Sequence, residues 1–532
     1  MSRRPQLRVG QDNITPFGLD IHNPVFVVSG GVIFLFVLGT LVFQNQAARF
    51  FSWLLPAILS GFDWFFLSAG NVFVLFALLL VFLPVGKVRL GGPDAKPEFS
   101  YPGWFGMLFA AGMGIGLMYF GVSEPLSHFG AALDGPVTDT GGLRSDAAPL
   151  GGAAGDATAA RDLAMAATIY HWGLHPWAIY TVVALALAFF AYNHGLPLTL
   201  RSAFYPILGD RVRGWWGHVI DVLAVFATLF GLATSLGLGT TQALAGFNLL
   251  YGWGTGGVAA VVLIGVITLL AVVSVVRGLD RGIKVLSGVN MTLALALLLA
   301  VIAIGPTGGI LVTAARGALA YAANFVPLAM PFGREDTGFS HDWTSFYWAW
   351  WVSWSPFVGM FIARVSRGRT VREFVVCVIL IPTLLSIVWM AAFGGTAISQ
   401  TIADSTAPVA SAAQEVMLFR MVEQFPLSAV LSLAGIVLVL VFFVTSSDSG
   451  SLVVDTITAG GKEDVPTSQR VFWATLEGVV AAVLLMVGGT GALDALRAMT
   501  VSTGLPFTLV LLAMCYCVWV GLWAAVREKR GA

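Results

Sequence analysis

Long apolar runs alternate with shorter polar segments along the whole sequence. A helix of about 20 apolar residues is long enough to cross the hydrocarbon core of a bilayer. The pattern therefore predicts twelve transmembrane helices. Their expected ranges are 24–44, 63–85, 104–122, 172–193, 217–240, 256–275, 288–305, 344–363, 374–394, 425–444, 471–489 and 504–525.

The positions of lysine and arginine provide a second test of this topology. If the N-terminus is inside, 21 of the 28 basic residues fall in inside segments. Cytoplasmic loops of membrane proteins carry such an excess of Lys and Arg. The sequence therefore predicts a multi-pass protein with both termini in the cytoplasm.

Two of the predicted outside segments are long. Residues 123–171 are rich in Gly, Ala and Asp, which predicts a mobile loop. Residues 306–343 have a mixed apolar pattern, and this predicts a helix lying in the outer interface at about 309–330. On the inside, Thr370 and Glu373 form a capping-box pattern that starts the ninth span.

Composition agrees with a membrane protein. Hydrophobic residues make up 57% of the chain and charged residues 11%, and the mean hydropathy is +0.85, whereas soluble proteins have about 25% charged residues. The net charge is zero, so a nucleic-acid partner is not expected. Cys377, Cys515 and Cys517 lie in apolar runs, which excludes a disulfide framework or a zinc site. The polar N-terminus is not expected to be a cleaved signal.

Tryptophan is concentrated in the eighth predicted span, where five residues fall within twelve positions: Trp343, Trp348, Trp350, Trp351 and Trp354. At helical spacing, Trp350 and Trp354 share one face and Trp351 flanks them. Interfacial belts hold Trp at helix ends, but these residues lie ten or more positions before Arg364. The pattern favours an aromatic cage, with a packing seam as the alternative.

Three alternate glycines, Gly112, Gly114 and Gly116, lie in the third predicted span. Small residues allow helices to pack closely, but alternate glycines also weaken a helix. Unwound backbone at membrane depth lines a cavity or is buried in protein, and its carbonyls can bind a cation. The sequence leaves both interpretations open.

The tenth predicted span ends in a hydroxyl-rich segment that includes Thr445 and Ser446. Such hydroxyls commonly bond back to the carbonyl one turn earlier, but several neutral oxygens also suit a hard cation. Asp448 is expected at the membrane edge, where it could cap or pair.

The fourth predicted span begins with a second aromatic cluster, formed by Trp172, Trp177 and Tyr180. His171 and His175 have a spacing that suits a metal pair. Neither Glu nor Cys accompanies them in the sequence, and Pro176 indicates that His171 precedes the helix. The metal interpretation is therefore disfavoured.

Four stretches resemble the betaine/choline/carnitine transporter family: 110–129, 171–180, 347–374 and 444–451. The resemblance implies an all-α membrane protein with a LeuT-like fold of two inverted five-helix repeats. The implied organisation is a cytoplasmic segment 1–23, two additional helices in 24–103, the first repeat in 104–305, an outer loop with an interfacial helix in 306–343, the second repeat in 344–525, and a short cytoplasmic end 526–532.

The resemblance also implies roles for individual residues. It places the substrate among Trp172, Trp177, Tyr180, Trp350, Trp351 and Trp354, with selectivity from Gly112, Gly114 and Gly116. It makes Phe361 a cytoplasmic gate. It builds a sodium site from the carbonyls of Ala110, Met113 and Phe442 and the hydroxyls of Thr445 and Ser446. A second sodium site of the family uses two threonines; Thr228 matches one, but Leu232 stands at the other.

These features predict sodium symport of a betaine-like zwitterion into a bacterium across its inner membrane. An indole face holds a trimethylammonium or sulfonium group, which has no N–H to donate. Choline-type members tend to carry Asp where this chain has Gly116, and a betaine carboxylate would be repelled by that Asp. Glycine betaine and dimethylsulfoniopropionate are candidate compatible solutes. The alternative is proton-coupled or exchange transport of choline or carnitine.

Neither a membrane enzyme nor a passive channel is favoured by this distribution of polar residues. No cofactor is expected, with sodium as the coupling ion. The family resemblance predicts a homotrimer embedded in membrane lipids, with the interfacial helix as a candidate contact.

Overall fold

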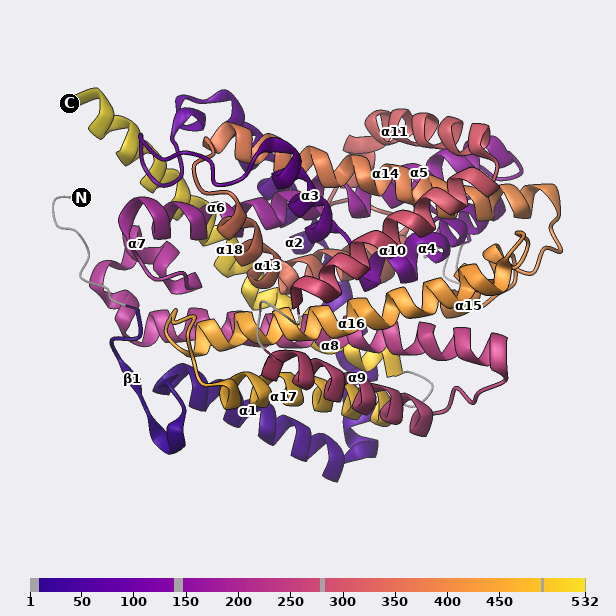
Figure 1. Cartoon of the computed structure of the whole chain (residues 1–532). Helices are drawn as coiled ribbons and strands as arrows, with labels where there is room; N and C mark the ends of the chain where they lie inside the picture. The colour runs from indigo at the N-terminus through magenta and orange to yellow at the C-terminus, as the bar shows by residue number, and fades with distance from the viewer. Residues whose placement is uncertain (1–8, 138–146, 278–282, 489–491, 532) are drawn as a thin grey trace.

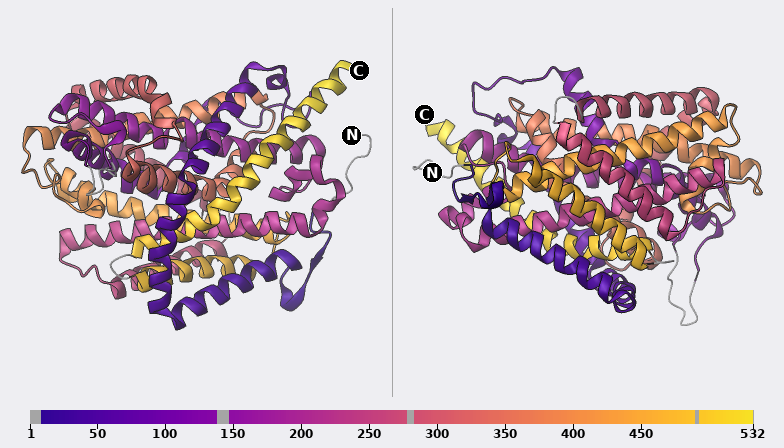
Figure 2. Two further views of the ribbon diagram at one scale, coloured as in Figure 1. Left: turned by 180° about the vertical axis from the view of Figure 1, so that it is seen from behind. Right: turned by 60° about the horizontal axis from the view of Figure 1, so that its bottom comes forward.

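The computed structural model describes residues 9–137, 147–277, 283–488 and 492–531. These residues are almost entirely helical, apart from one antiparallel pair of two-residue strands, β1 (Asn13–Ile14) and β2 (Ile21–His22). Long helices such as α8 and α16 run side by side across the molecule, and both termini lie at the same end of it (Figure 1; Figure 2).

Eleven described helices or continuous helix pairs are long and apolar enough to cross a membrane, or twelve if a bent pair counts as one span. The eleven are α1 (Asn23–Val42), α2 (Gln44–Phe82), α5 (Ala157–Trp172) with α6 (Leu174–His194), α8 (Trp215–Tyr251), α9 (Gly257–Arg277), α10 (Ile283–Ile304), α11 (Thr307–Ala329), α14 (Val371–Ala403), α16 (Ser428–Thr458), α17 (Thr467–Gly488) and α18 (Ala492–Gly531). The bent pair is α3 (Tyr101–Gly112) with α4 (Ile115–Asp134).

The remaining helices are mostly short. The α-helices are α7 (Tyr205–Leu208), α12 (Thr337–Phe339), α13 (Phe346–Val365) and α15 (Gln414–Val422). The 3-10 and π segments are η1 (Pro16–Gly18), η2 (Pro84–Lys87), η3 (Pro149–Gly151), η4 (Leu200–Phe204), η5 (Gly209–Arg213) and η6 (Ser340–Ser345).

Hydropathy does not follow burial in helices α11 and α13. The apolar set includes α11 and leaves out α13, the predicted eighth span. Protein buries 16 of the 20 residues of α13, and its Trp, Tyr and Ser side chains lower its hydropathy. In contrast, α11 buries a narrow stripe that includes Ile310, Thr313, Gly317 and Tyr321. It packs on α5 and α14, and its position in the outer interface remains a prediction.

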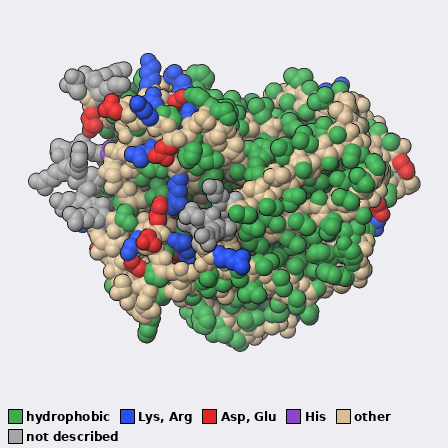
Figure 3. All heavy atoms as spheres, viewed as in Figure 1, with side chains coloured by type: hydrophobic (Ala, Val, Ile, Leu, Met, Phe, Trp, Pro, Cys, Tyr) green, Lys and Arg blue, Asp and Glu red, His purple; other side chains and the backbone are tan. Residues whose placement is uncertain are grey.

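The outer surface of the bundle is apolar. Hydrophobic side chains cover most of the face seen in Figure 3, and charged side chains gather toward the end that holds the termini. Exposed side chains include Phe34, Leu75, Val258 and Leu269. Large contiguous apolar surfaces mark contact with lipid or protein.

The prediction of a loop over 123–171 is wrong for most of its length. Helix α4 continues to Asp134, and α5 begins at Ala157, where Asp156 caps it by accepting hydrogen bonds from two backbone amides. His171 therefore lies in the last turn of α5 rather than before a helix, and Gly173 separates α5 from α6. Residues 138–146 lie outside the described part of the chain.

The predicted end of the tenth span is also wrong. Helix α16 continues to Thr458, so the hydroxyl-rich segment lies inside the helix and not at its end. Asp448 is buried there and accepts a hydrogen bond from Ser274 Oγ at 2.5 Å. The predicted capping box at the start of α14 is confirmed, because the Thr370 hydroxyl and the Glu373 carboxylate each accept the other's backbone N–H.

The N-terminal strand pair is fastened to the connection between α16 and α17. Asn13 Nδ2 donates to the carbonyl of Ala459 at 2.9 Å, and Asp20 forms an ion pair with Lys462. Burial opposes ionisation of Asp20, but hydrogen bonds from Lys462 and Asn13, together with the Lys462 charge, hold its pKa below the ordinary value. This contact joins segments more than 430 positions apart.

Candidate functional site

The third predicted span is broken where its glycines alternate. Helix α3 ends at Gly112 and α4 begins at Ile115, and the two axes differ by 66°. Met113 and Gly114 between them have extended backbone angles. The unwound interpretation of this stretch is therefore confirmed.

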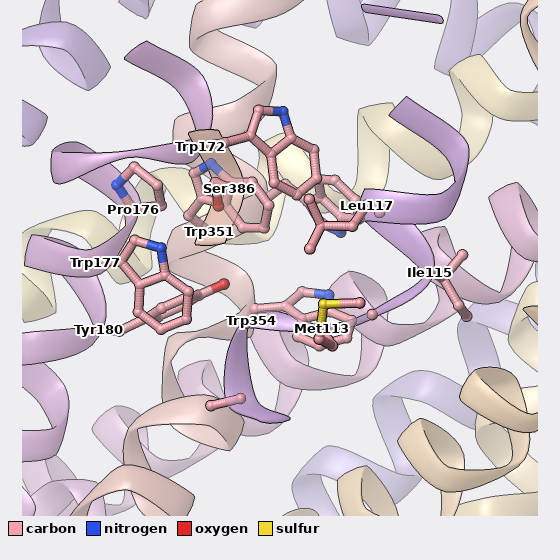
Figure 4. A pocket seen from close by; sticks show the side chains of 15 residues that line it. Met113, Ile115, Leu117, Trp172, Pro176, Trp177, Tyr180, Trp351, Trp354 and Ser386 are labelled. Atoms are coloured by element: carbon pink, nitrogen blue, oxygen red, sulfur yellow. The ribbon is translucent and has the colours of Figure 1, made fainter. Parts of the chain in front are cut away.

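A cavity lies against the break (Figure 4). All six aromatic residues of the predicted cage line it: Trp172, Trp177, Tyr180, Trp350, Trp351 and Trp354. They come from α5, α6 and α13, and Gly112, Gly114 and Gly116 also line the cavity. The structure thus brings together every residue predicted for the substrate cage and for selectivity.

The cage rings meet both edge to face and in stacks. The centroids of Trp172 and Trp351 are 4.9 Å apart with the rings at 76°, whereas Trp350 and Trp351 stack at the same separation and 19°. Trp177 meets Tyr180 edge to face at 5.3 Å. Such ring pairs stabilise one another. The same rings therefore pack together, as in a packing seam, and line a cavity, as in a cage.

Two of the three glycines make room for indoles. A Cβ on Gly116 would lie 2.8 Å from Trp350 Cη2 and 2.9 Å from Trp172 Cη2. A Cβ on Gly112 would lie 3.1 Å from Trp177 Cζ2, whereas one on Gly114 would meet no atom within 4 Å. The alternative interpretation of the glycines, close packing, therefore also applies. The groups that pack against Gly112 and Gly116 are indole side chains that line the cavity.

A second cavity lies beside the first. It is lined by all the residues predicted for sodium binding and for the gate: Ala110, Met113, Phe442, Thr445, Ser446 and Phe361. Trp354 and Met113 line both cavities. The indole of Trp354 donates to the carbonyl of Gly231 at 3.1 Å, and Trp350 donates to the same oxygen at 3.3 Å.

The hydroxyl of Thr445 has several oxygen and nitrogen neighbours. It lies 3.0 Å from the carbonyl oxygen of Val441 and 3.1 Å from that of Phe442, and it accepts a hydrogen bond from Asn290 Nδ2 at 2.9 Å. The commoner interpretation, a bond back to the preceding turn, therefore holds. A hydroxyl beside carbonyls in a cavity wall also matches the donors that a hard cation prefers.

The sequence did not identify Glu124 as part of the site. This fully buried residue of α4 accepts hydrogen bonds from Trp172 Nε1 at 2.6 Å, Tyr347 Oη at 2.5 Å and His171 Nδ1 at 2.7 Å. A signal was present, since Glu124 and His128 are i, i+4 polar residues within an apolar stretch.

His171 and His175, whose metal interpretation the sequence disfavoured, have different partners. His171 contacts Glu124, so a glutamate does accompany it, while His175 Nε2 lies 3.1 Å from Asn71 Oδ1. Glu124, His128 and His171 hold their ligand atoms within 4.8 Å of one another. Tetrahedral zinc ligands at about 2.0 Å from the metal lie about 3.3 Å apart, and the 2.7 Å contact of His171 with Glu124 is instead a hydrogen bond.

Comparison with known proteins gives consistent matches. Residues 24–527 match the family described as betaine/carnitine/choline family transporter. A glycine betaine/proline/choline transporter of Vibrio parahaemolyticus is 58% identical over 519 residues, which is 97% of this chain and 93% of the relative. Glycine betaine transporter 1 of the same organism is 53% identical, covering 97% and 96%. A glycine betaine/proline/choline/ectoine transporter, also from that organism, is 52% identical, covering 98% and 91%.

Proposed function

Because this chain belongs to the betaine/carnitine/choline transporter family, we propose that it imports a betaine-like zwitterion together with sodium by alternating access. It is a multi-pass membrane transporter and not an enzyme. The observation that carries the proposal is the convergence of six aromatic side chains on one cavity at a helix break.

The cavity suits a cation that cannot donate hydrogen bonds. A trimethylammonium or sulfonium group within about 6 Å of an indole face is attracted by about 2 kcal/mol or more when both are desolvated. Among the described residues that line the cavity, none is Asp or Glu. A zwitterion brings its own carboxylate, so a neutral lining avoids repulsion between two anions.

Sodium coupling is supported by the second cavity. Thr445 and Ser446 line this cavity together with Met113 of the helix break. Their hydroxyl oxygens are candidate sodium ligands. Two positions match the second sodium site of the family. The Thr228 hydroxyl donates to the carbonyl of Ala224 at 2.7 Å, and Leu232, which packs toward Gly450, has no side-chain oxygen to offer. We therefore propose one sodium site.

The substrate proposal has a definite rival. The names of two of the relatives above include choline and proline as well as glycine betaine, and one of these also includes ectoine. Gly116 favours a zwitterion, since it provides no carboxylate for choline. Proton-coupled or exchange transport of choline or carnitine is the alternative, and dimethylsulfoniopropionate is a further candidate.

Uptake into proteoliposomes tests the proposal directly. Radiolabelled glycine betaine, dimethylsulfoniopropionate, proline, ectoine, carnitine and choline would each be offered with an inward sodium gradient, with a proton gradient alone, and with neither. We expect sodium-dependent accumulation of glycine betaine in preference to choline. Full uptake driven by protons in sodium-free buffer would contradict the coupling, and preference for choline would contradict the substrate class.

The same proposal includes the assembly and its setting. We propose two inverted repeats over 104–305 and 344–525, since five crossings place the second repeat upside down relative to the first. We further propose a homotrimer in the inner membrane of a bacterium, with both termini in the cytoplasm. In Figure 1 the described parts of the chain begin and end at the same end of the molecule, as expected if both termini lie on one side of the membrane.

A further inference from the structure

A single carboxylate lies directly behind the aromatic cage. Glu124 is fully buried on α4, ten residues after the helix break. Its Oε2 accepts from Trp172 Nε1 and Tyr347 Oη, and its Oε1 accepts from His171 Nδ1. Glu124 does not line the cavity itself. The carboxylate therefore joins α4, α5 and α13 without access to a ligand.

Two cage indoles are tied to this group. Trp172 is bound through its ring nitrogen, which points away from the cavity while the six-membered ring points into it (Figure 4). Trp351 donates from Nε1 to the backbone carbonyl of His171 at 3.0 Å, and Tyr347 stacks on Trp351 at 5.7 Å. The relative position of these two indoles thus depends on the hydrogen bonds that Glu124 accepts from Trp172, Tyr347 and His171.

The histidine beside Glu124 fits a neutral ring. With the proton on Nδ1, His171 donates to Glu124, and its Nε2 accepts from Thr344 Oγ1 at 2.9 Å. Both contacts are satisfied without a second proton on the ring. His128 Nε2 lies 3.4 Å from Glu124 Oε1. With a neutral His171, the negative charge stays on the Glu124 carboxylate, which the donated hydrogen bonds stabilise.

We propose that Glu124 is a positioning residue that also increases the affinity of the cage for a cation, acting through the N–H group of Trp172. This inference rests on the proposed function. A hydrogen bond to an ionised acceptor is about twice as strong as a neutral one. It draws the N–H proton toward the carboxylate and leaves more electron density on the indole face, which is the surface that attracts a cation.

This arrangement reconciles two requirements of a zwitterion site. A carboxylate in contact with the ligand would attract the ammonium but repel the ligand's own carboxylate. A carboxylate placed behind an indole contributes through the ring on which the cationic group rests. Glu124 therefore favours the cationic end of a ligand while leaving the cavity wall uncharged.

The test compares a charged ligand with a neutral-headed analogue of the same shape. In 3,3-dimethylbutanoate a carbon atom replaces the quaternary nitrogen of glycine betaine. Competition against radiolabelled glycine betaine, on the purified full-length protein, gives both affinities. We expect Glu124→Gln to weaken binding of glycine betaine about tenfold and to change that of the analogue less than twofold. A purely structural role would weaken both ligands equally and would overturn the inference.

A double-mutant cycle tests whether Glu124 acts through the N–H group of Trp172. Trp172→Phe keeps an aromatic ring but removes the N–H group, so adding Glu124→Gln to it should cost less than twofold in betaine affinity. A full tenfold loss in that background would overturn the inference. Glu477→Gln is the matched control, since Glu477 is another buried glutamate, on α17, and lines neither cavity.

Thermal unfolding checks that each variant is folded. If Glu124→Gln does not fold, Trp172→Phe alone carries the test, and an unchanged ratio of betaine to analogue affinity would overturn the inference. Wild-type protein that binds no quaternary ammonium ligand would overturn the proposed function together with this inference. Normal wild-type binding with an unaffected Glu124→Gln variant would overturn this inference alone.

Discussion

Replacing Gly116 by alanine adds one methyl group where two cage indoles converge. The new Cβ would lie 2.8 Å from one indole carbon and 2.9 Å from the other, whereas ordinary contacts begin at 3.4 Å. Each ring end must therefore withdraw by about half an ångström. The rings belong to Trp350 and Trp172, which both approach Gly116 at the start of α4.

The size of the effect depends on whether the cavity is filled. Alanine is favoured over glycine in a helix by about 0.5–1 kcal/mol, and overpacking costs about 1–3 kcal/mol. In the empty protein the indoles can relax into the cavity, so these contributions partly cancel. A bound ligand occupies that space, and the overpacking then opposes binding. We expect a loss of about 1–2 kcal/mol, or about 5- to 30-fold in Kd.

Equilibrium binding of radiolabelled glycine betaine to the purified protein measures this loss. Gly114→Ala is the matched control, because it adds the same methyl group to the same break, in extended backbone with no atom within 4 Å. We expect its Kd to stay within about threefold of the wild type. Wild-type affinity in Gly116→Ala, or an equal loss in both variants, would refute the packing argument.

Four further predictions follow from the cavities, the surface and the N-terminal contact. Trp351→Leu and Trp354→Leu should each weaken betaine binding by about 30-fold, since a cation on a desolvated indole gains about 2 kcal/mol, and unchanged affinity in a fluorescence titration would rule out the cage. Thr445→Ala should raise the sodium concentration for half-maximal uptake while Thr445→Ser should not, and equal sodium dependence would remove the hydroxyl from the site. Native mass spectrometry with lipids retained should show a trimer, and monomers alone would contradict the proposed assembly. Asp20→Asn should lower thermal stability at pH 7 by up to about 1 kcal/mol. The folded pKa of Asp20 is below 3.8, so the difference from wild type should shrink as the pH falls through it. A difference that grows on acidification would refute the ion pair with Lys462.

Local periodicity predicted part of the aromatic wall of the cavity. Trp350 and Trp354 are one helical turn apart, so their common face follows from the sequence alone. The alternate glycines left two interpretations open, a helix break from weak helix preference and close packing of helices. Both are present in the structure, with Gly114 in the break and Gly116 against the indoles.

Contacts between distant segments could not be predicted in this way. Glu124 meets His171 across 47 positions and Tyr347 across 223, and no local pattern encodes such pairs. The predicted third span ended at residue 122, two positions before Glu124. The predicted tenth span also ended too early, because the hydroxyls of α16 lie buried between helices and many bond back to their own turn.

Trp354 separates the two cavities, and its attachment has a kinetic consequence. An indole hydrogen bond to Gly231 and edge contacts with the rings of Trp350 and Phe357 hold this ring in place, and each such contact contributes about 1 kcal/mol. Side chains with room to turn change rotamer within nanoseconds, whereas packed helices rearrange over microseconds to milliseconds. We expect this partition to open and close many times during one transport cycle. The turnover number should therefore be governed by movement of the helices around the break and remain nearly unchanged when the partition itself is made smaller.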